Sequence, residues 1–254
     1  MGKRLEGKIA VITGANSGLG EAVSTLFASE GASIVIAARR QEPLDAISAK
    51  ISETGSLVHA VVTDVTSQEG VEKLFAETIE KFGRVDILVN CAGILDGNAG
   101  ITKASDEVAL RLFETNTLGT MRCMQAALKY MLPAGAGSIV NVASVAGVRG
   151  QGGAAYCMSK GGVVALTQCV ALQYQQQGIR ANVICPGGII TPMLMKADRS
   201  TFDTDMLKAL AAHTAQGTPL STAPEQANLI LFLASDESSA VNGQAIISDK
   251  GNTL

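Results

Sequence analysis

Two side chains that can carry a proton lie four residues apart in the stretch YCMSK, which runs from Tyr156 to Lys160. In a helix, residues with this spacing share a face, so the Tyr156 hydroxyl and the Lys160 ammonium can approach each other. A free tyrosine has a pKa of about 10, and a nearby cation lowers that pKa by stabilising the phenolate. The pair therefore predicts a general acid and base, with two chance surface neighbours as the alternative.

A glycine-rich loop, TGANSGLG, follows the first apolar run of the chain. Gly14, Gly18 and Gly20 allow positive φ angles and a close approach of backbone to phosphate. A helix that begins in this loop presents free N–H groups and its positive dipole end to an anion. The spacing is one residue wider than GxGxxG, so a structural turn is the alternative, but the flanking strand and helix favour a dinucleotide site.

The end of the second apolar run bears on which dinucleotide binds. Ala38 is followed by Arg39 and Arg40, with no carboxylate to hold the ribose 2′-hydroxyl of NAD. A guanidinium suits a 2′-phosphate, because it forms paired charge-assisted hydrogen bonds. We therefore expect NADP(H) to be preferred and NAD(H) to be possible. Two solvated arginines at the start of a helix are the alternative.

Three more polar residues accompany the Tyr–Lys pair. Ser144 follows the fifth expected strand, Asn90 heads NCAG after the fourth, and Asn116 lies in a long helical segment. All but Asn116 lie at or near carboxyl ends of strands, where ligands bind in parallel sheets. Ser144 could instead be a turn residue at the end of a strand, and Asn116 could cap or bridge backbone groups. Asp64, after the third expected strand, could likewise be a residue at the start of a helix.

These residues need a scaffold, and short β-branched runs alternate with longer helical patterns along the whole chain. The alternation predicts an α/β fold with right-handed βαβ units, a parallel sheet and helices on both faces. The expected strands are 8–14, 33–38, 57–65, 84–93, 137–144, 180–187 and 245–249. The expected helices are about 20–30, 67–83, 106–132 (closed by Pro133) and the segment that carries YCMSK.

The motifs occur together in this chain: TGANSGLG, TDV at Asp64, NCAG, Asn116, Ser144, YCMSK and PGGIITP from Pro186 to Pro192. As a set, they resemble the motifs of the short-chain dehydrogenase/reductase family, compact single-domain type. The resemblance covers essentially the whole chain. It implies a Rossmann-like, doubly wound parallel seven-stranded sheet and one dinucleotide-binding and catalytic domain over residues 1–254. It also implies a nicotinamide cofactor. Two departures are Cys91, where the family usually has Asn, and Lys250, where a second Gly of a DGG turn is usual.

The resemblance assigns roles to individual residues. The implied catalytic tetrad is Asn116, Ser144, Tyr156 and Lys160: Tyr156 exchanges the proton, Ser144 holds the substrate oxygen, Lys160 also holds the nicotinamide ribose, and Asn116 holds a proton-relaying water. Asp64 and the next N–H, that of Val65, would contact the adenine, and Ile189 and Thr191 the carboxamide. The full cofactor-binding set is Gly14, Asn16, Ser17, Gly18, Leu19, Gly20, Arg39, Arg40, Asp64, Val65, Asn90, Ala92, Gly93, Tyr156, Lys160, Pro186, Gly187, Ile189 and Thr191.

The segment at about 191–214 corresponds to a substrate lid in the family. It carries six Met, Leu and Phe side chains that suit a bulky apolar ligand, although they could equally pack the lid onto the body. We expect oxidation of a hydrophobic secondary alcohol or reduction of its ketone, such as a hydroxysteroid or bile acid. A 3-oxoacyl thioester or a sugar or polyol is the alternative substrate. The six residues are Met193, Leu194, Met195, Phe202, Met206 and Leu207.

Composition narrows the remaining classes. The 254 residues are 47% hydrophobic and carry a net charge of −3. The sequence has no block of basic residues and no long apolar run, so we expect neither nucleic-acid nor membrane binding. The five cysteines are scattered, which predicts reduced thiols, no metal site and a cytoplasmic protein. Helices that are apolar on more than one face predict packing on a partner as well as on the sheet, and the family resemblance implies a homotetramer. A nucleotide-sensing relative would be expected to lose Tyr156 or Lys160, and an extended epimerase would carry TGxxGxxG and a longer substrate domain.

Overall fold

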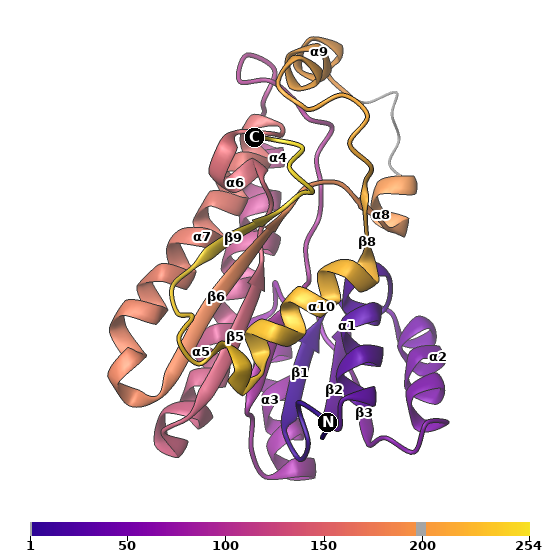
Figure 1. Cartoon of the computed structure of the whole chain (residues 1–254), viewed down its shortest axis with the longest axis vertical. Helices are drawn as coiled ribbons and strands as arrows, with labels where there is room; N and C mark the ends of the chain where they lie inside the picture. Colours follow the sequence, from indigo (N-terminus) through magenta and orange to yellow (C-terminus); the bar gives the residue numbers. More distant parts are fainter. Residues whose placement is uncertain (1, 197–201) are drawn as a thin grey trace.

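Seven parallel strands form one sheet in the computed structural model, which describes residues 2–196 and 202–254. Their order is β3-β2-β1-β4-β5-β6-β9 (Figure 1), and every pairing is parallel. The predicted doubly wound α/β fold is therefore confirmed. The strands are β1 Ile9–Thr13, β2 Ser33–Ala38, β3 Val58–Val62, β4 Ile87–Asn90, β5 Gly137–Val142, β6 Ile179–Pro186 and β9 Ala245–Ser248, and a separate parallel pair joins β7 Ile189–Ile190 to β8 Ser221–Thr222.

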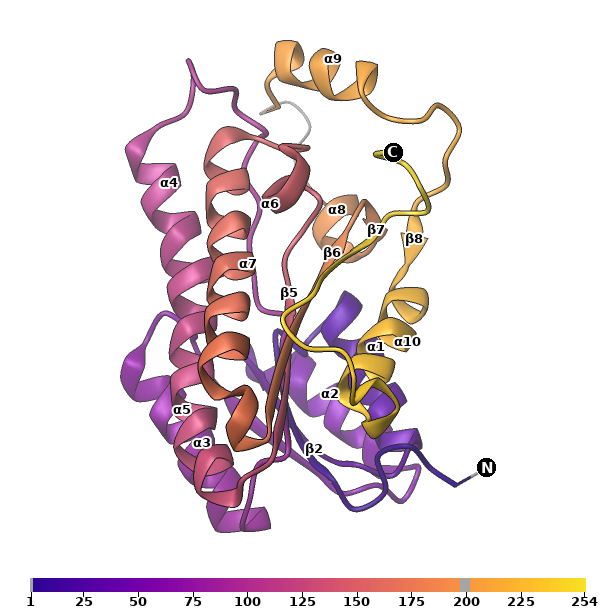
Figure 2. The same cartoon turned by 60° about the vertical axis from the view of Figure 1, so that its left-hand side comes forward.

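Helices cover both faces of the sheet, as Figure 2 shows. One apolar core lies between the sheet and α1, α2 and α10, and a second lies between the sheet and α3, α5 and α7. Because both faces are covered, the strands carry near-continuous apolar runs. The covering helices are α1 Gly18–Ser29, α2 Gln41–Ser52, α10 Ala223–Ala234, α3 Gln68–Phe82, α5 Gly119–Ala134 and α7 Ala154–Tyr174.

Shorter helices lie along the connections. A π-helical turn, Phe113–Leu118, joins α4 to α5, and α9 lies beyond the carboxyl ends of the strands (Figure 1). The part of the predicted lid at 197–201 lies outside the described residues. The shorter α-helices are α4 Asp106–Leu112, α6 Ala146–Arg149, α8 Pro192–Met195 and α9 Thr204–Ala212, and two 3₁₀ turns are Gln175–Gln177 and Asp236–Ser238.

Two of the covering helices, α2 and α10, were not among the helices expected from the sequence, and neither were the shorter α6, α8 and α9. Helix α10 begins with a capping box: the Thr222 hydroxyl accepts from the Glu225 N–H at 3.4 Å, and the Glu225 carboxylate accepts from the Thr222 N–H at 2.7 Å. The T-x-x-E spacing was a readable signal. The long helix also extends past Pro133 and ends at Gly135, which has a φ of +64°.

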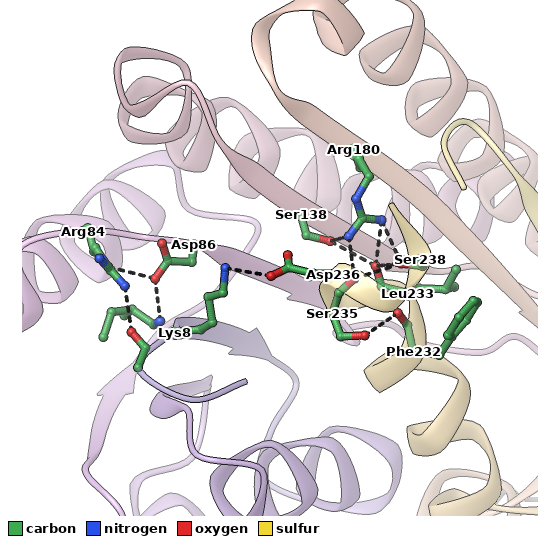
Figure 3. Close-up of polar contacts among 12 residues, drawn as sticks. Lys8, Arg84, Asp86, Ser138, Arg180, Phe232, Leu233, Ser235, Asp236 and Ser238 are labelled. Carbon is green, nitrogen blue, oxygen red and sulfur yellow. Dashed lines mark hydrogen bonds and ion pairs between the residues drawn. The ribbon is translucent and has the colours of Figure 1, made fainter. Parts of the chain in front are cut away.

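Polar side chains fasten the amino ends of the strands (Figure 3). Arg180, near the start of β6, donates to the Leu233 and Ser235 carbonyls at the end of α10, each at 3.0 Å. Asp86, just before β4, accepts from the Ile9 N–H of β1 at 2.7 Å and from Arg84 Nε at 3.0 Å. This end of the sheet is closed by hydrogen bonds, whereas the opposite end carries the predicted site.

Candidate active site

A cavity of about 420 Å³ opens at the carboxyl ends of the strands, where the sequence predicted the site. Its volume is in the range of small-molecule binding sites. Of the predicted site residues, those that line it are Gly14, Asn16, Ser17, Gly18, Leu19, Gly20, Ala92, Gly93, Ser144, Tyr156, Lys160, Pro186, Gly187, Ile189 and Thr191. The cavity brings together the glycine loop, the Tyr–Lys pair and the start of the predicted lid.

The glycine loop is packed too tightly for larger residues. Gly14 has a φ of +66°, and a Cβ there would lie 2.7 Å from the Ala92 nitrogen. A Cβ on Gly20 would overlap the Gly14 carbonyl oxygen. Gly18 has a φ of +58° and lies beside Thr191, because a Cβ on Gly18 would lie 3.2 Å from Thr191 Cβ. The loop thus offers backbone rather than side chains to a ligand, as a pyrophosphate requires.

Arg40 lies against this loop. With its amide oxygen turned toward the guanidinium, Asn16 accepts hydrogen bonds from Arg40 Nη2 at 3.0 Å and Nε at 3.2 Å. Arg40 precedes the first residue of α2 without a capping hydrogen bond from its side chain, and both Arg39 and Arg40 are exposed and do not line the cavity. The guanidinium is therefore held beside the predicted cofactor loop by a residue of that loop.

Helix α7 and the end of β5 position the Tyr–Lys pair. Lys160 Nζ lies 5.9 Å from the centroid of the Tyr156 ring and donates to the Val142 carbonyl at 2.9 Å. Ser144 follows β5, and its Oγ accepts from the Ala146 N–H at 3.1 Å. All three side chains reach the cavity. The helical spacing in YCMSK therefore does place the phenol and the ammonium on one side of α7.

Burial governs the protonation of the pair. Burial lowers the pKa of Lys160 from 10.5 to about 8, so the ammonium remains charged at neutral pH. Burial raises the pKa of the Tyr156 phenol, although a hydrogen bond with Ser144 opposes the rise. The sequence interpretation expected Lys160 to lower this pKa. The structure differs because desolvation of the buried phenolate outweighs the hydrogen bond with Ser144, and the charge of Asp96 adds to the rise in pKa.

Asn116 does not line the cavity but is fully buried in the π-helical turn. Its Oδ1 accepts from the Ile94 N–H at 2.8 Å, and its Nδ2 donates to the Ile94 carbonyl at 3.1 Å and to Ser159 Oγ at 3.0 Å. Asn116 thus ties the loop after β4 to α7. Turns of this kind occur frequently at functional sites.

Asn90 belongs to a buried polar row across three strands. Thr13, Asn90 and Asn141 are in register on β1, β4 and β5. The Asn90 amide donates to Asn141 Oδ1 at 2.9 Å, and the Asn141 amide donates to Thr167 Oγ1 of α7 at 2.9 Å. Thr13 in turn accepts from the Ala92 N–H at 3.3 Å. The row therefore supports the cavity floor from inside.

Two other predicted cofactor residues lie outside the cavity lining. Asp64 accepts from the backbone and the hydroxyl of Thr66, at 2.9 and 2.8 Å. Val65 is buried, and a Cβ on Gly119 would lie 2.7 Å from its Cγ2. These contacts give Asp64 and Val65 clear structural roles, and their predicted contacts with adenine remain predictions.

The sequence interpretation missed part of the cavity wall. Leu95, Asp96, Asn98, Gln151 and Leu210 also line it, whereas Met195, Met206 and Leu207 of the expected apolar set do not. Asp96 and Asn98 lie three and five residues after Gly93, the last residue of NCAG, and this closeness to the motif was the available signal.

Three hydrogen bonds between Asp203 and the loop after β4 hold the start of α9 in place. The Asp203 carboxylate, 6% exposed, accepts from the Gly100 N–H at 3.0 Å and from Lys103 Nζ at 2.7 Å. The Asp203 N–H donates to the Gly97 carbonyl at 3.0 Å. The hydrogen bond from Lys103 is the main reason that the pKa of Asp203 falls from 3.8 to about 2. The lid helix and the loop after β4 are therefore joined.

Lys250 stands where the family usually has glycine, and its surroundings partly compensate for the larger residue. Lys250 has a φ of +56°, the left-handed conformation that favours glycine. Its ammonium pairs with Glu225 at 2.9 Å, at the start of α10. Thus a position where glycine is usual carries a lysine in the same strained backbone, with one ion pair in compensation.

The described part of the chain has no group of three or more His, Cys, Asp or Glu side chains arranged to hold a metal ion. None of its helices is long and apolar enough to cross a membrane.

Comparisons with known proteins agree with this geometry. A sequence profile described as enoyl-(acyl carrier protein) reductase matches residues 14–253. The chain is 36% identical to a 3β-hydroxysteroid dehydrogenase of Mediterraneibacter gnavus, over 98% of this chain and 96% of that one. It is 37% identical to a 3-oxoacyl-[acyl-carrier-protein] reductase of Thermotoga maritima, over 98% of each. The crystal structure of levodione reductase matches with a TM-score of 0.89 and 34% identity, over 98% of both chains. The chain therefore belongs to the short-chain dehydrogenase/reductase family of oxidoreductases.

Proposed function

We propose that this protein interconverts a bulky hydrophobic secondary alcohol, such as a hydroxysteroid or bile acid, and its ketone, with NADP(H) as the preferred cofactor. The observation that carries the proposal is the joint placement of Tyr156, Lys160 and Ser144 in one cavity beside the glycine loop. The same cavity has an apolar side, formed by Leu95, Val145, Met193, Leu194, Phe202 and Leu210.

The glycine loop and the strand ends suit a nicotinamide dinucleotide, which supplies the hydride acceptor or donor when bound. Tyr156 exchanges the proton of the substrate oxygen: its protonated phenol donates during ketone reduction and its phenolate accepts during alcohol oxidation. Ser144 orients the substrate oxygen toward that phenol. Lys160, held by the Val142 carbonyl at 2.9 Å, places a positive charge beside the phenolate as it forms.

Arg39 and Arg40 support the NADP(H) preference. They stand where an NAD-binding chain has a carboxylate, and Arg40 is already directed against the cofactor loop by Asn16. Isothermal titration of wild-type protein should give a lower Kd for NADP⁺ than for NAD⁺. The double change Arg39→Ala and Arg40→Ala should remove that difference, and the exposed Lys81→Ala should keep it. Equal affinity in the wild type would refute the preference.

The substrate class rests on the cavity. The apolar side residues lie beside the acid–base pair, and no described lysine or arginine other than Lys160 lines the cavity, which disfavours a substrate that needs a cation. The 3-oxoacyl-[acyl-carrier-protein] reductase relative makes thioester reduction the second candidate.

The test follows the absorbance of reduced nicotinamide. Wild-type protein is mixed with NADP⁺ or NAD⁺ and hydroxysteroids, bile acids, polyols or simple secondary alcohols, and with NADPH and a 3-oxoacyl thioester. Turnover of steroids that Tyr156→Phe lowers by orders of magnitude, with cofactor affinity nearly intact, is the expected result. Turnover that survives in Tyr156→Phe would refute the assignment of the proton donor.

We also propose that the protein acts in the cytoplasm as a homotetramer. Leu110 of α4 and Met158 and Leu172 of α7 are exposed by 69%, 54% and 75%, which supports a further partner for these helices. The five free cysteines suit a reducing compartment. Light scattering at micromolar concentration should give the mass of four chains, and a monomer would contradict this.

A further inference from the structure

Asn16 and Arg40 meet at the edge of the cavity, where two neighbouring strands end. Strands β1 and β2 are in register at Thr13 and Ala37, and the Ala15 N–H donates to the Ala37 carbonyl at 3.2 Å. The glycine loop after β1 therefore lies beside the residues that follow β2. Asn16 lines the cavity, whereas Arg40 lies outside its lining. The contact between the two residues thus connects the cavity to a guanidinium just beyond its edge.

This contact uses one edge of the Arg40 guanidinium. With its amide oxygen turned toward Arg40, Asn16 accepts from Nη2 at 3.0 Å and from Nε at 3.2 Å. A guanidinium carries five N–H donors in a planar fork. The second edge of the fork, formed by one N–H of Nη1 and one of Nη2, takes no part in this contact. Such an edge can donate two parallel hydrogen bonds to the oxygens of a phosphate.

The positive charge of Arg40 is available to an anion at that second edge. No carboxylate in the described part of the chain pairs with Arg40, and the ion pair of α2 joins Lys50 to Glu21 instead, at 3.4 Å. Asn16 is neutral, so its amide oxygen orients the guanidinium without cancelling the charge. An aspartate of the same shape would do both. An anion beside the glycine loop therefore meets a cation that is already oriented.

Prior orientation matters because Arg40 is exposed. A long exposed side chain loses rotamer freedom when it binds a ligand, and this loss weakens binding. Apart from the contact with Asn16, the Arg40 guanidinium makes no hydrogen bond to other residues that the structure describes. Asn16 therefore removes part of the ordering cost before a ligand arrives. Arg39 is exposed as well, but of the two arginines only Arg40 hydrogen-bonds to Asn16.

We propose that Asn16 determines cofactor specificity by holding Arg40 so that the second edge of its guanidinium binds the 2′-phosphate of NADP(H). Asn16 is a positioning residue, because it acts on the phosphate through Arg40. The inference rests on the proposed function, since it concerns the preference for NADP(H). It goes further by separating the two arginines: the contribution of Arg40 depends on Asn16, and that of Arg39 does not.

Titration calorimetry without substrate tests the inference through the ratio of the Kd for NAD⁺ to the Kd for NADP⁺. An effect common to both cofactors cancels in this ratio. Asn16→Ala should lower the wild-type ratio about 2- to 10-fold, as the loss of one oriented side chain allows. Asn16→Asp keeps an acceptor of the same shape but adds a negative charge, so the ratio should fall further than in Asn16→Ala. A ratio that Asn16→Asp preserves would overturn the proposal.

A double-mutant cycle separates positioning from a general effect on the glycine loop. When Arg40→Ala is already present, Asn16→Ala should not change the ratio further. When Arg39→Ala is present instead, Asn16→Ala should still lower the ratio, and this is the matched control. Equal effects of Asn16→Ala in the two arginine variants would overturn the role of Asn16.

Arg40→Lys provides a second variant at an exposed position, which carries the test if the Asn16 variants unfold. An ammonium cannot bind both Asn16 and a phosphate through paired hydrogen bonds, so the ratio should fall. An unchanged ratio in Arg40→Lys would overturn the inference.

The outcomes also distinguish this inference from the proposed function. A wild-type ratio above unity that Asn16→Ala leaves unchanged would overturn the role of Asn16 alone. A wild-type ratio at or below unity would refute the NADP(H) preference itself. Absence of turnover with every alcohol and ketone would refute the proposed reaction, whereas the binding constants would still decide the role of Asn16.

Discussion

Gly14→Ala would test whether residue 14 must be glycine because of its close contact with the Ala92 backbone as well as because of its positive φ angle. Gly14 has a φ of +66°, and its added Cβ would lie 2.7 Å from the Ala92 nitrogen and 2.8 Å from Ala92 Cα. Both are backbone atoms, so no side chain can turn aside to make room. Gly7 is a matched control, because its φ is +70° and nothing lies within 4 Å of its added Cβ.

The two substitutions share one cost and differ in another. A left-handed alanine costs about 1–2 kcal/mol at either position. Overpacking against fixed atoms adds about 1–3 kcal/mol at Gly14 only. The expected losses in free energy of unfolding are therefore about 1–2 kcal/mol for Gly7→Ala and about 2–5 kcal/mol for Gly14→Ala.

Urea denaturation at a fixed protein concentration measures both losses, since an oligomer's midpoint depends on concentration. Titration calorimetry with NADP⁺ provides a second readout. Gly14→Ala should weaken binding because Ala92 and the loop must separate, and Gly7→Ala should leave Kd unchanged. Equal losses of stability in the two variants would show that the Ala92 contact yields easily and would refute the packing argument.

Three further predictions concern Lys160, Asp203 and Lys250. The folded pKa of Lys160 is lowered from 10.5 to about 8, so the unfolded chain binds the extra proton between these values and stability gains a term that rises with pH. In Lys160→Met this rise should be missing when the free energy of unfolding in urea is compared at pH 8 and pH 10. An equal change in that free energy in the wild type and in Lys160→Met would contradict the burial argument. Asp203→Ala removes the hydrogen bonds to Gly100 and Lys103, so the KM for the substrate should rise several-fold. The Kd for NADP⁺ should stay constant. An unchanged KM would exclude a role for this contact in substrate binding. Lys250→Gly and Lys250→Ala both lose the ion pair with Glu225, but glycine relieves the φ of +56°, so thermal unfolding should show the glycine variant to be more stable by about 1 kcal/mol. Equal stability of these two variants would mean that the left-handed backbone is not strained.

Local patterns predicted most of the fold. The strand runs and the helix that carries Tyr156 and Lys160 follow from hydrophobic period, and their parallel arrangement follows from strand–helix alternation. Boundaries were less certain: the expected strand 84–93 is Ile87–Asn90 in the structure. The long helix passes Pro133 by one residue, Ala134, so the proline removes one helical hydrogen bond, that of its own missing N–H, close to the helix end.

The parts of the site that depend on distant contacts could not be predicted. The hydrogen bond from Gly100 to Asp203 joins residues 103 positions apart, and no local period encodes it. The π-helical turn at Asn116 continues the helical segment on both sides, and its contacts with Ile94 and Ser159 lie far along the chain or on another helix. The direction of the Tyr156 pKa also depends on burial, which spacing alone does not give.

The row of Thr13, Asn90 and Asn141 also bears on how the strands find their alignment. Strands buried on both faces lack the alternation that normally fixes register, so β1, β4 and β5 could slide past one another with little change in apolar burial. A shift of one residue in β4 would place Asn90 beside an apolar neighbour. The buried amides of Asn90 and Asn141 would then lack hydrogen-bond partners, which costs about 1–3 kcal/mol of stability for each unpaired group. The row would then select a single alignment among many of similar hydrophobic energy. Because Ala92 lies two residues beyond Asn90, that choice also decides where the cavity floor is built.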